Sequence, residues 1–128
     1  MAVIVDYDAG NLRSVQRACD EVGLTATISD DPKTIRRADR IIFPGVGAAG
    51  SAMRSIRKSG VDVALRQAFQ ADVPILGICL GLQISLEFSE EDNQTTRGFL
   101  AGNVCGFLLN RPDLIIPHIG WIEVEVRR

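Results

Sequence analysis

The sequence has 128 residues, enough for one domain with its own core, and 46% of them are hydrophobic. A net charge of −2 without a basic cluster argues against a nucleic-acid-binding protein. We find no signal peptide and no apolar run near the roughly 20 residues that a membrane span needs, and therefore expect a cytoplasmic protein. Three widely spaced cysteines, Cys19, Cys79 and Cys105, form neither a disulfide framework nor a metal-binding pattern, so we expect no metal site.

The first part of the chain predicts strands that alternate with helices. Strands are expected at Ala2–Val5, Leu24–Ser29 and Asp39–Phe43, where short apolar runs are bounded by turn residues. The turn Asp8–Asn11 ends in a cap residue, and Asp30-Asp31-Pro32 opens a short helix. The apolar positions at helical spacing are Leu12, Val15, Cys19 and Val22, then Ala49, Ala52, Met53 and Ile56, then Val61, Ala64, Leu65, Ala68 and Phe69. This order predicts an α/β fold, a doubly wound and mostly parallel sheet with helices on both faces.

The stretch Pro74–Gln83 contains the strongest functional signal. Its apolar run indicates a buried strand that leads into Gly-x-Cys-x-Gly around Cys79, and the segment up to Glu87 predicts a helix. A nucleophile between two glycines on a sharp strand-to-helix turn is typical of a nucleophile elbow, in which a Cβ at either glycine would clash. The helix N-terminus would favour the thiolate. We therefore predict that Cys79 attacks a carbonyl group. The alternative, a small buried hydrophobe, is disfavoured by the glycines.

The segment Gly45–Gly50 matches the pattern G-x-G-x-x-G between a strand and a helix, which suggests a dinucleotide site. Three features argue against that interpretation. The segment follows the third strand, Pro44 precedes it, and the acidic residues Asp62 and Asp72 do not end a strand. We favour a turn whose backbone N–H groups lie beside the elbow and help to form an oxyanion hole.

The second part of the chain offers weaker candidates. Gln83 lies one helical turn past Cys79, so its amide can reach a ligand held at the thiol, whereas Glu91 lies in an acidic run typical of a solvated loop. The single histidine, His118, is either a candidate base or part of a surface turn in which Trp121 anchors a partner. Alternation along Trp121–Arg128 predicts a half-exposed antiparallel strand.

Four motifs, in this order, resemble those of one known family. They are Asp6–Leu12, Pro44–Gly47, Gly77–Gln83 and Pro117–Trp121. The third resembles the nucleophile motif of class I (triad-type) glutamine amidotransferases. Together the four resemble the glutaminase subunits of imidazole glycerol phosphate synthases, enzymes of histidine biosynthesis. The resemblance implies a flavodoxin-like fold, a single domain over residues 1–128, and an antiparallel extension near the C-terminus.

The resemblance also implies a reaction that needs no cofactor. Cys79 would attack the side-chain amide of glutamine, release ammonia and leave a glutamyl thioester that water hydrolyses. The backbone N–H of Leu80 and one from Val46-Gly47 would stabilise the oxyanion. Substrate contacts are implied for Gly47, Gln83 and Glu91.

A partner follows from the same resemblance. Asn11, His118 and Trp121 match positions that face a cyclase subunit, a (β/α)₈ barrel that receives the ammonia in a heterodimer. The family's catalytic histidine and glutamate lie in a later His-Pro-Glu motif that these residues do not include. We therefore expect negligible glutaminase activity from the 128 residues alone, and an open edge at Trp121–Arg128 that favours aggregation. A catalytically dead partner-binding module and another cysteine hydrolase on the same fold remain alternatives.

Overall fold

A four-stranded parallel sheet organises the protein. The computed structural model describes residues 1–96, 98–106 and 120–127. The strands are β1 (Ala2–Val5), β2 (Ala26–Ser29), β3 (Arg40–Gly45) and β4 (Ile75–Cys79), and their order in the sheet is β2-β1-β3-β4. All three pairings are parallel, as the alternating pattern predicts.

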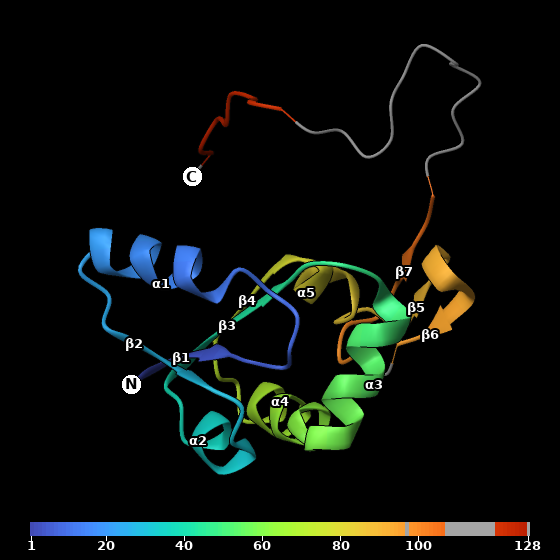
Figure 1. Cartoon of the computed structure of the whole chain (residues 1–128), viewed down its shortest axis with the longest axis horizontal. Helices are drawn as coiled ribbons and strands as arrows, with labels where there is room; N and C mark the ends of the chain where they lie inside the picture. Colours follow the sequence, from blue (N-terminus) through green and yellow to red (C-terminus); the bar gives the residue numbers. More distant parts are fainter. Residues whose placement is uncertain (97, 107–119, 128) are drawn as a thin grey trace.

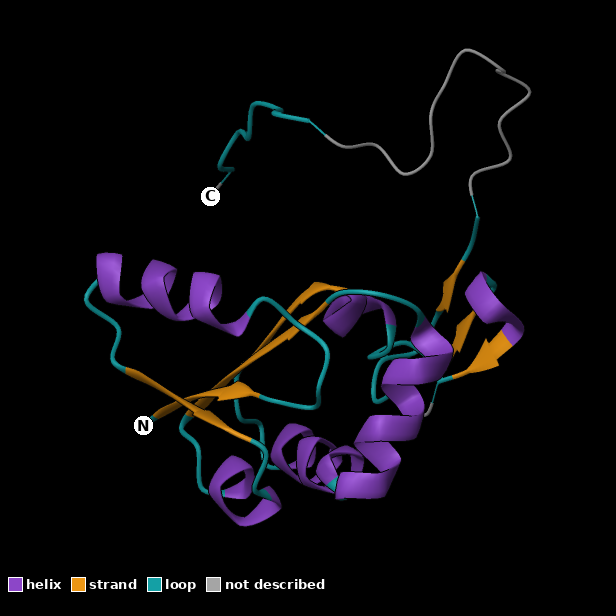
Figure 2. Cartoon of the chain, viewed as in Figure 1, coloured by secondary structure: helices purple, strands orange, loops and turns teal. Residues whose placement is uncertain are grey.

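Helices cover both faces of this sheet. Helix α1 (Leu12–Glu21) lies on one face, and α2 (Pro32–Arg36), α3 (Ala49–Ser59) and α4 (Val61–Gln70) lie on the other (Figures 1 and 2). A short helix, α5 (Leu80–Gln83), follows β4 directly. This arrangement confirms the predicted doubly wound fold.

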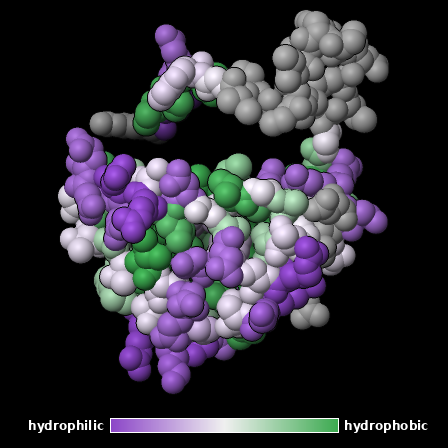
Figure 3. Space-filling view, in the orientation of Figure 1, coloured by the Kyte–Doolittle hydropathy of each residue, from purple (hydrophilic) through white to green (hydrophobic). Residues whose placement is uncertain are grey.

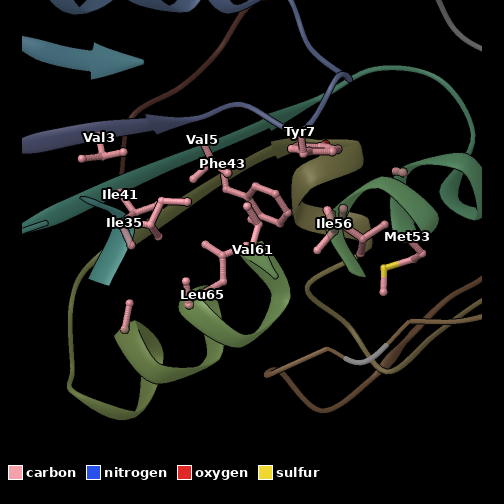
Figure 4. Packing of buried hydrophobic residues seen from close by; sticks show 14 of the residues in the cluster. Val3, Val5, Tyr7, Ile35, Ile41, Phe43, Met53, Ile56, Val61 and Leu65 are labelled. Atoms are coloured by element: carbon pink, nitrogen blue, oxygen red, sulfur yellow. The ribbon is translucent and has the colours of Figure 1, made fainter. Parts of the chain in front are cut away.

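The core has two parts because successive strand side chains point to opposite faces. Val3, Val5 and Phe43 pack toward α2, α3 and α4, as Figure 4 shows for the larger cluster. Ile4 packs with the smaller cluster on the α1 side, where Cys19 is buried, as predicted. Because both faces of the sheet are covered, the central strands β1 and β3 contain continuous apolar runs.

Two polar residues start helices as the sequence predicts. The Asn11 side-chain oxygen accepts a hydrogen bond from the Ser14 N–H at 3.3 Å and caps α1. The carboxylate of Asp31 accepts from the N–H groups of Lys33 and Thr34, both at 3.1 Å, and caps α2. Val22, which helical spacing groups with Cys19, does not share its burial: this residue is the C-cap of α1 and is 77% exposed.

The helix predicted up to Glu87 ends at Gln83 instead. Backbone groups needed to prolong it bond elsewhere: the Ser85 carbonyl accepts from the Leu100 N–H, and the Glu87 N–H donates to the Gly102 carbonyl, each at 2.9 Å. Contacts with residues distant in sequence therefore stop the helix after one turn.

The prediction that β4 is buried is also wrong. Leu76 is 59% exposed and Ile78 is 39% exposed. In the described part of the chain β4 is the edge strand of the sheet, with β3 on one side only. An apolar run identifies the strand but does not determine what covers it.

A small second sheet follows, with the order β6-β5-β7. It consists of β5 (Phe88–Ser89), β6 (Gln94–Thr95) and β7 (Asn103–Val104), and the 3₁₀-helix Glu91–Asn93 lies between the first two. The pair β5–β6 is antiparallel and β5–β7 is parallel. The described antiparallel pairing therefore lies at residues 88–95, well before the segment Trp121–Arg128 for which an antiparallel strand is predicted.

Residues 120–127 form no strand, contrary to the prediction for Trp121–Arg128, whose last residue lies outside the described ranges. They stand apart from the sheets (Figures 1 and 3). The side chains of Trp121, Ile122, Val124 and Val126 are all highly exposed. Alternation alone does not make a strand, because a strand requires hydrogen bonds to a neighbour. Within the described ranges, no helix is long and apolar enough to cross a membrane.

Candidate functional site: a cysteine on a strand-to-helix turn

Cys79 occupies the sharp turn that the sequence predicts. It is the last residue of β4, and α5 begins at the next residue, Leu80. Its backbone angles, φ 52° and ψ −118°, lie in a region that residues with a Cβ rarely adopt. The side chain is exposed. This is the geometry of a nucleophile elbow, and an exposed thiol does not fit the alternative of a small buried hydrophobe.

The glycines on either side of Cys79 permit close contact between backbone segments. A Cβ on Gly81 would lie 1.8 Å from the carbonyl oxygen of Phe43, and a Cβ on Gly77 would lie 2.8 Å from the Cα of Leu82. Both distances are far below van der Waals contact. The structure thus confirms that the Gly-x-Cys-x-Gly pattern is a steric requirement of the turn.

The glycine-rich turn lies next to the elbow. Gly45, the last residue of β3, pairs with Cys79 in the parallel register, and Val46-Gly47 follows immediately. Val46 is exposed, and Gly47 has φ 95°, a conformation that glycine adopts without strain. The carboxyl ends of parallel strands meet at one edge of a sheet, which explains this juxtaposition. The use of these N–H groups as oxyanion donors stays a prediction.

Tyr7, which the sequence analysis did not single out, lies at the same edge. It follows β1, is 2% exposed, and its hydroxyl donates to the carbonyl oxygen of Pro44 at 2.8 Å. Its ring centroid lies 5.3 Å from that of Phe43, and Figure 4 shows both rings. Burial raises the pKa of Tyr7 above its ordinary value, and the charge of nearby Cys79 raises it further. The signal in the sequence that could have identified Tyr7 as a site residue is its position just after a predicted parallel strand.

The other predicted site residues lie on several elements. Gln83 is half-buried and ends α5, whereas Glu91 is exposed and begins the 3₁₀-helix of the second sheet. Asn11 is exposed at the start of α1, Trp121 is exposed, and His118 lies outside the described residues. The structure therefore brings together the elbow, whose helix α5 carries Gln83, and the Val46-Gly47 turn, while Asn11, Glu91 and Trp121 stand on other parts of the chain.

A hollow of about 290 Å³ shares Gly77 and Leu82 with the elbow. Phe69, Phe99 and Ser85 also line it, but Cys79 does not. The hollow is therefore not the predicted glutamine site. Among the residues that the structure describes, no three His, Cys, Asp or Glu side chains are grouped as metal ligands would be.

Comparison with known proteins decides the family. The sequence model described as "Glutamine amidotransferase class-I" matches residues 3–105, a range that includes the elbow and the glycine-rich turn. This chain belongs to that family. Solved structures agree on the fold: one titled "Crystal structure of glutamine amidotransferase" has a TM-score of 0.66 at 20% identity, over 77% of this chain and 52% of that one. A putative peptidase E from Listeria monocytogenes has a TM-score of 0.57 at 16% identity, over 68% and 50%.

Two curated relatives of this amidotransferase chain carry the same name. "Imidazole glycerol phosphate synthase subunit HisH" of Listeria monocytogenes serotype 4a (strain HCC23) is 41% identical over 129 aligned residues. The protein of the same name from Nitratidesulfovibrio vulgaris (strain DP4) is 42% identical over 133. Each alignment covers 100% of this chain and 62% of the relative. The chain thus spans 62% of the length of these relatives.

Proposed function

We propose that this chain supplies the nucleophile of a glutaminase subunit of imidazole glycerol phosphate synthase, which hydrolyses glutamine to glutamate and ammonia. One observation carries the proposal: the exposed Cys79 sits on an elbow beside the Val46-Gly47 turn. The identity of 41–42% to two HisH subunits supports the choice of substrate. In the same proposal, residues 1–128 belong to one domain of a cytoplasmic enzyme.

The reaction proceeds through a thioester. The Cys79 sulfur attacks the side-chain amide carbon of glutamine, and the carbonyl oxygen becomes an oxyanion. The N–H of Leu80 and one from Val46-Gly47 donate to that oxygen, each lowering the barrier by roughly 3 kcal/mol. As the C–N bond breaks, the proton lost by the Cys79 thiol is delivered through the base to the amide nitrogen, which leaves as ammonia. Water then hydrolyses the glutamyl thioester to glutamate and returns the thiol.

The remaining roles concern substrate and partner. Gln83 and the Gly47 backbone hold glutamine, and the carboxylate of Glu91 pairs with its α-amino group. Asn11, His118 and Trp121 face a cyclase subunit with a (β/α)₈ barrel, which takes up the ammonia in a heterodimer. In this assignment Asn11 combines two roles, because its side chain also caps α1.

The test uses the full-length protein with its cyclase, because the proposed reaction also needs a base that the family resemblance places after residue 128. Ammonia release from glutamine is measured for the wild type and for Cys79→Ser. We expect the variant to lose activity by at least about 10³-fold, since a hydroxyl is a far weaker nucleophile than a thiolate. Cys105→Ser is the matched control and should retain activity.

A second measurement identifies the nucleophile directly. An electrophilic glutamine analogue should label Cys79, as mapped by peptide mass spectrometry, and faster with the cyclase present. Labelling at Cys105 instead, or ammonia release by Cys79→Ser at the wild-type rate, would refute the proposal. Cyclase binding without labelling would support the catalytically dead module.

Gln83 tests the substrate class. Gln83→Ala should raise KM for glutamine by about tenfold, because it removes one amide contact to the bound substrate. Unchanged glutamine affinity would favour a different cysteine hydrolase on the same fold.

A further inference from the structure

We propose that Tyr7 is a positioning residue for the oxyanion turn: its hydroxyl anchors the Pro44 carbonyl and so holds Val46-Gly47 at a fixed place beside Cys79. The inference rests on the proposed function and adds a residue to its machinery. Three independent contacts support it.

The first contact is the anchor itself. The Tyr7 hydroxyl donates to the Pro44 carbonyl at 2.8 Å, and both residues are buried. Pro44 lies two residues before Val46, so this hydrogen bond holds the peptide that leads into the turn. Loss of a partner inside a protein leaves a buried polar group with its full desolvation penalty. The Pro44 peptide therefore has a strong preference for this orientation.

The second contact joins Tyr7 to the elbow. A Cβ on Gly45 would lie 2.2 Å from the Tyr7 hydroxyl oxygen, 2.9 Å from the Cβ of Leu80 and 2.9 Å from the Gly81 nitrogen. The phenol, the end of β3 and the start of α5 thus converge on one point. Any shift of the phenol reaches Gly45, which pairs with Cys79.

The third contact places the loop after β1 on both sides of the turn. A Cβ on Gly10 would lie 3.6 Å from the Pro44 ring, before the turn. The Ser55 hydroxyl donates to the Asp8 carboxylate at 3.4 Å, from α3, which begins after the turn. The loop that begins with Tyr7 thus approaches Pro44 before the turn and is bonded to α3 after it.

Tyr7 does not serve as the base for the thiol. Its proton is already donated to Pro44, and burial raises the pKa of Tyr7, so the phenol stays protonated at neutral pH. A permanently protonated phenol retains its hydrogen bond throughout the reaction. Its contribution is thus the placement of the oxyanion donors, which is worth most in the transition state.

The experiment compares wild type and Tyr7→Phe in the full-length protein with its cyclase, by steady-state glutamine hydrolysis. Phenylalanine keeps the ring contact with Phe43 and removes only the anchor. We expect kcat to fall about tenfold while KM for glutamine stays within about twofold, since the donors act on the transition state. Alkylation of Cys79 by iodoacetamide, mapped by mass spectrometry, should keep its rate because that displacement forms no oxyanion.

Ile35→Val serves as the control for a general loss of stability. Ile35 is fully buried against the sheet on α2, and the change should lower the Tm without lowering kcat. A second variant, Ser55→Ala, removes the surface contact to Asp8 without threatening the core and should lower kcat about two- to threefold.

Each outcome is decisive. The inference is wrong if Tyr7→Phe keeps the wild-type kcat, if Tyr7→Phe changes only KM, or if Ile35→Val loses as much kcat as Tyr7→Phe. None of these results contradicts the proposed function. Wild-type protein that hydrolyses no glutamine refutes the proposed function, and the inference falls with it.

Discussion

At the scale of single residues, backbone contacts around Cys79 leave almost no room for substitution. Gly81 lies against the β3 backbone, where an added Cβ would come within 1.8 Å of the Phe43 oxygen. Cys79 adopts a φ of 52° because the chain must turn sharply here to bring α5 against the β3 backbone. The strain of the elbow and the need for glycine have the same cause.

Gly81→Ala should therefore destabilise the protein by at least about 2 kcal/mol, because either β3 or α5 must move. Thermal unfolding followed by circular dichroism measures the effect. Gly106→Ala is the matched control, since its Cβ would meet the Glu90 carboxylate at an ordinary 3.5 Å. Equal melting temperatures for the two variants would contradict the proposed steric role of Gly81.

At the scale of elements, the caps determine where helices begin. Asp31 precedes Pro32 and accepts hydrogen bonds from two backbone N–H groups and from the Thr34 hydroxyl, the last at 2.8 Å. The bond from the Thr34 hydroxyl, followed by that from the Lys33 N–H, lowers the pKa of Asp31 below its ordinary value. The cap is therefore favoured in its charged form.

The sign of the pH dependence follows from that direction. A carboxyl whose pKa is lower in the folded than in the unfolded protein stabilises the fold fully above the unfolded value of about 3.9. The stabilisation disappears as the pH falls through the folded value. We expect Asp31→Ala to lower the Tm by a constant amount near neutral pH, and by a shrinking amount below about pH 4.

Thermal melts from about pH 7 down to pH 3 test this, with Asp31→Asn as the control that keeps a capping oxygen without the charge. A difference in Tm that stays constant through the acid range would show that the charge of Asp31 does not contribute.

At the scale of the whole molecule, the open side of β4 is the most exposed apolar region of the main sheet. Leu76 and Ile78 project from an edge strand, and a hollow of about 400 Å³ extends from them to α1. The unpaired backbone N–H and C=O groups of an apolar edge strand can form hydrogen bonds with a strand of another chain. An open edge is predicted at Trp121–Arg128, whereas in the described residues the main sheet has the two edge strands β2 and β4, and its exposed large apolar side chains lie on β4.

We predict that the 128-residue polypeptide self-associates as its concentration rises and that Leu76→Lys reduces this, because a charge on an edge strand opposes pairing. Light scattering over a concentration series measures the effect. Val63→Lys, at a similarly exposed apolar position on α4, is the matched control and should leave association unchanged. Equal suppression by both variants would point to a general charge effect instead.

The amino-acid sequence by itself determined the features that depend on neighbouring residues. Apolar periodicity and turn residues located the four strands and the first four helices within a few residues. The glycines around Cys79 predicted the elbow, because the clash that they avoid is a property of that turn. The elbow motif indicated the class I glutamine amidotransferases, the family that the match over residues 3–105 confirms.

Only the tertiary structure decided features that depend on distant partners. Leu100 and Gly102 stop the helix after Cys79 by bonding Ser85 and Glu87, and no local pattern announces these bonds. The exposure of β4 and the unpaired state of residues 120–127 depend on which strands lie beside them. Tyr7 meets Pro44 across 37 positions of the chain, because parallel strands bring their carboxyl ends to one edge. Secondary-structure preferences depend on neighbouring residues. The pairing of strands and the burial of their side chains depend on residues that only folding brings together.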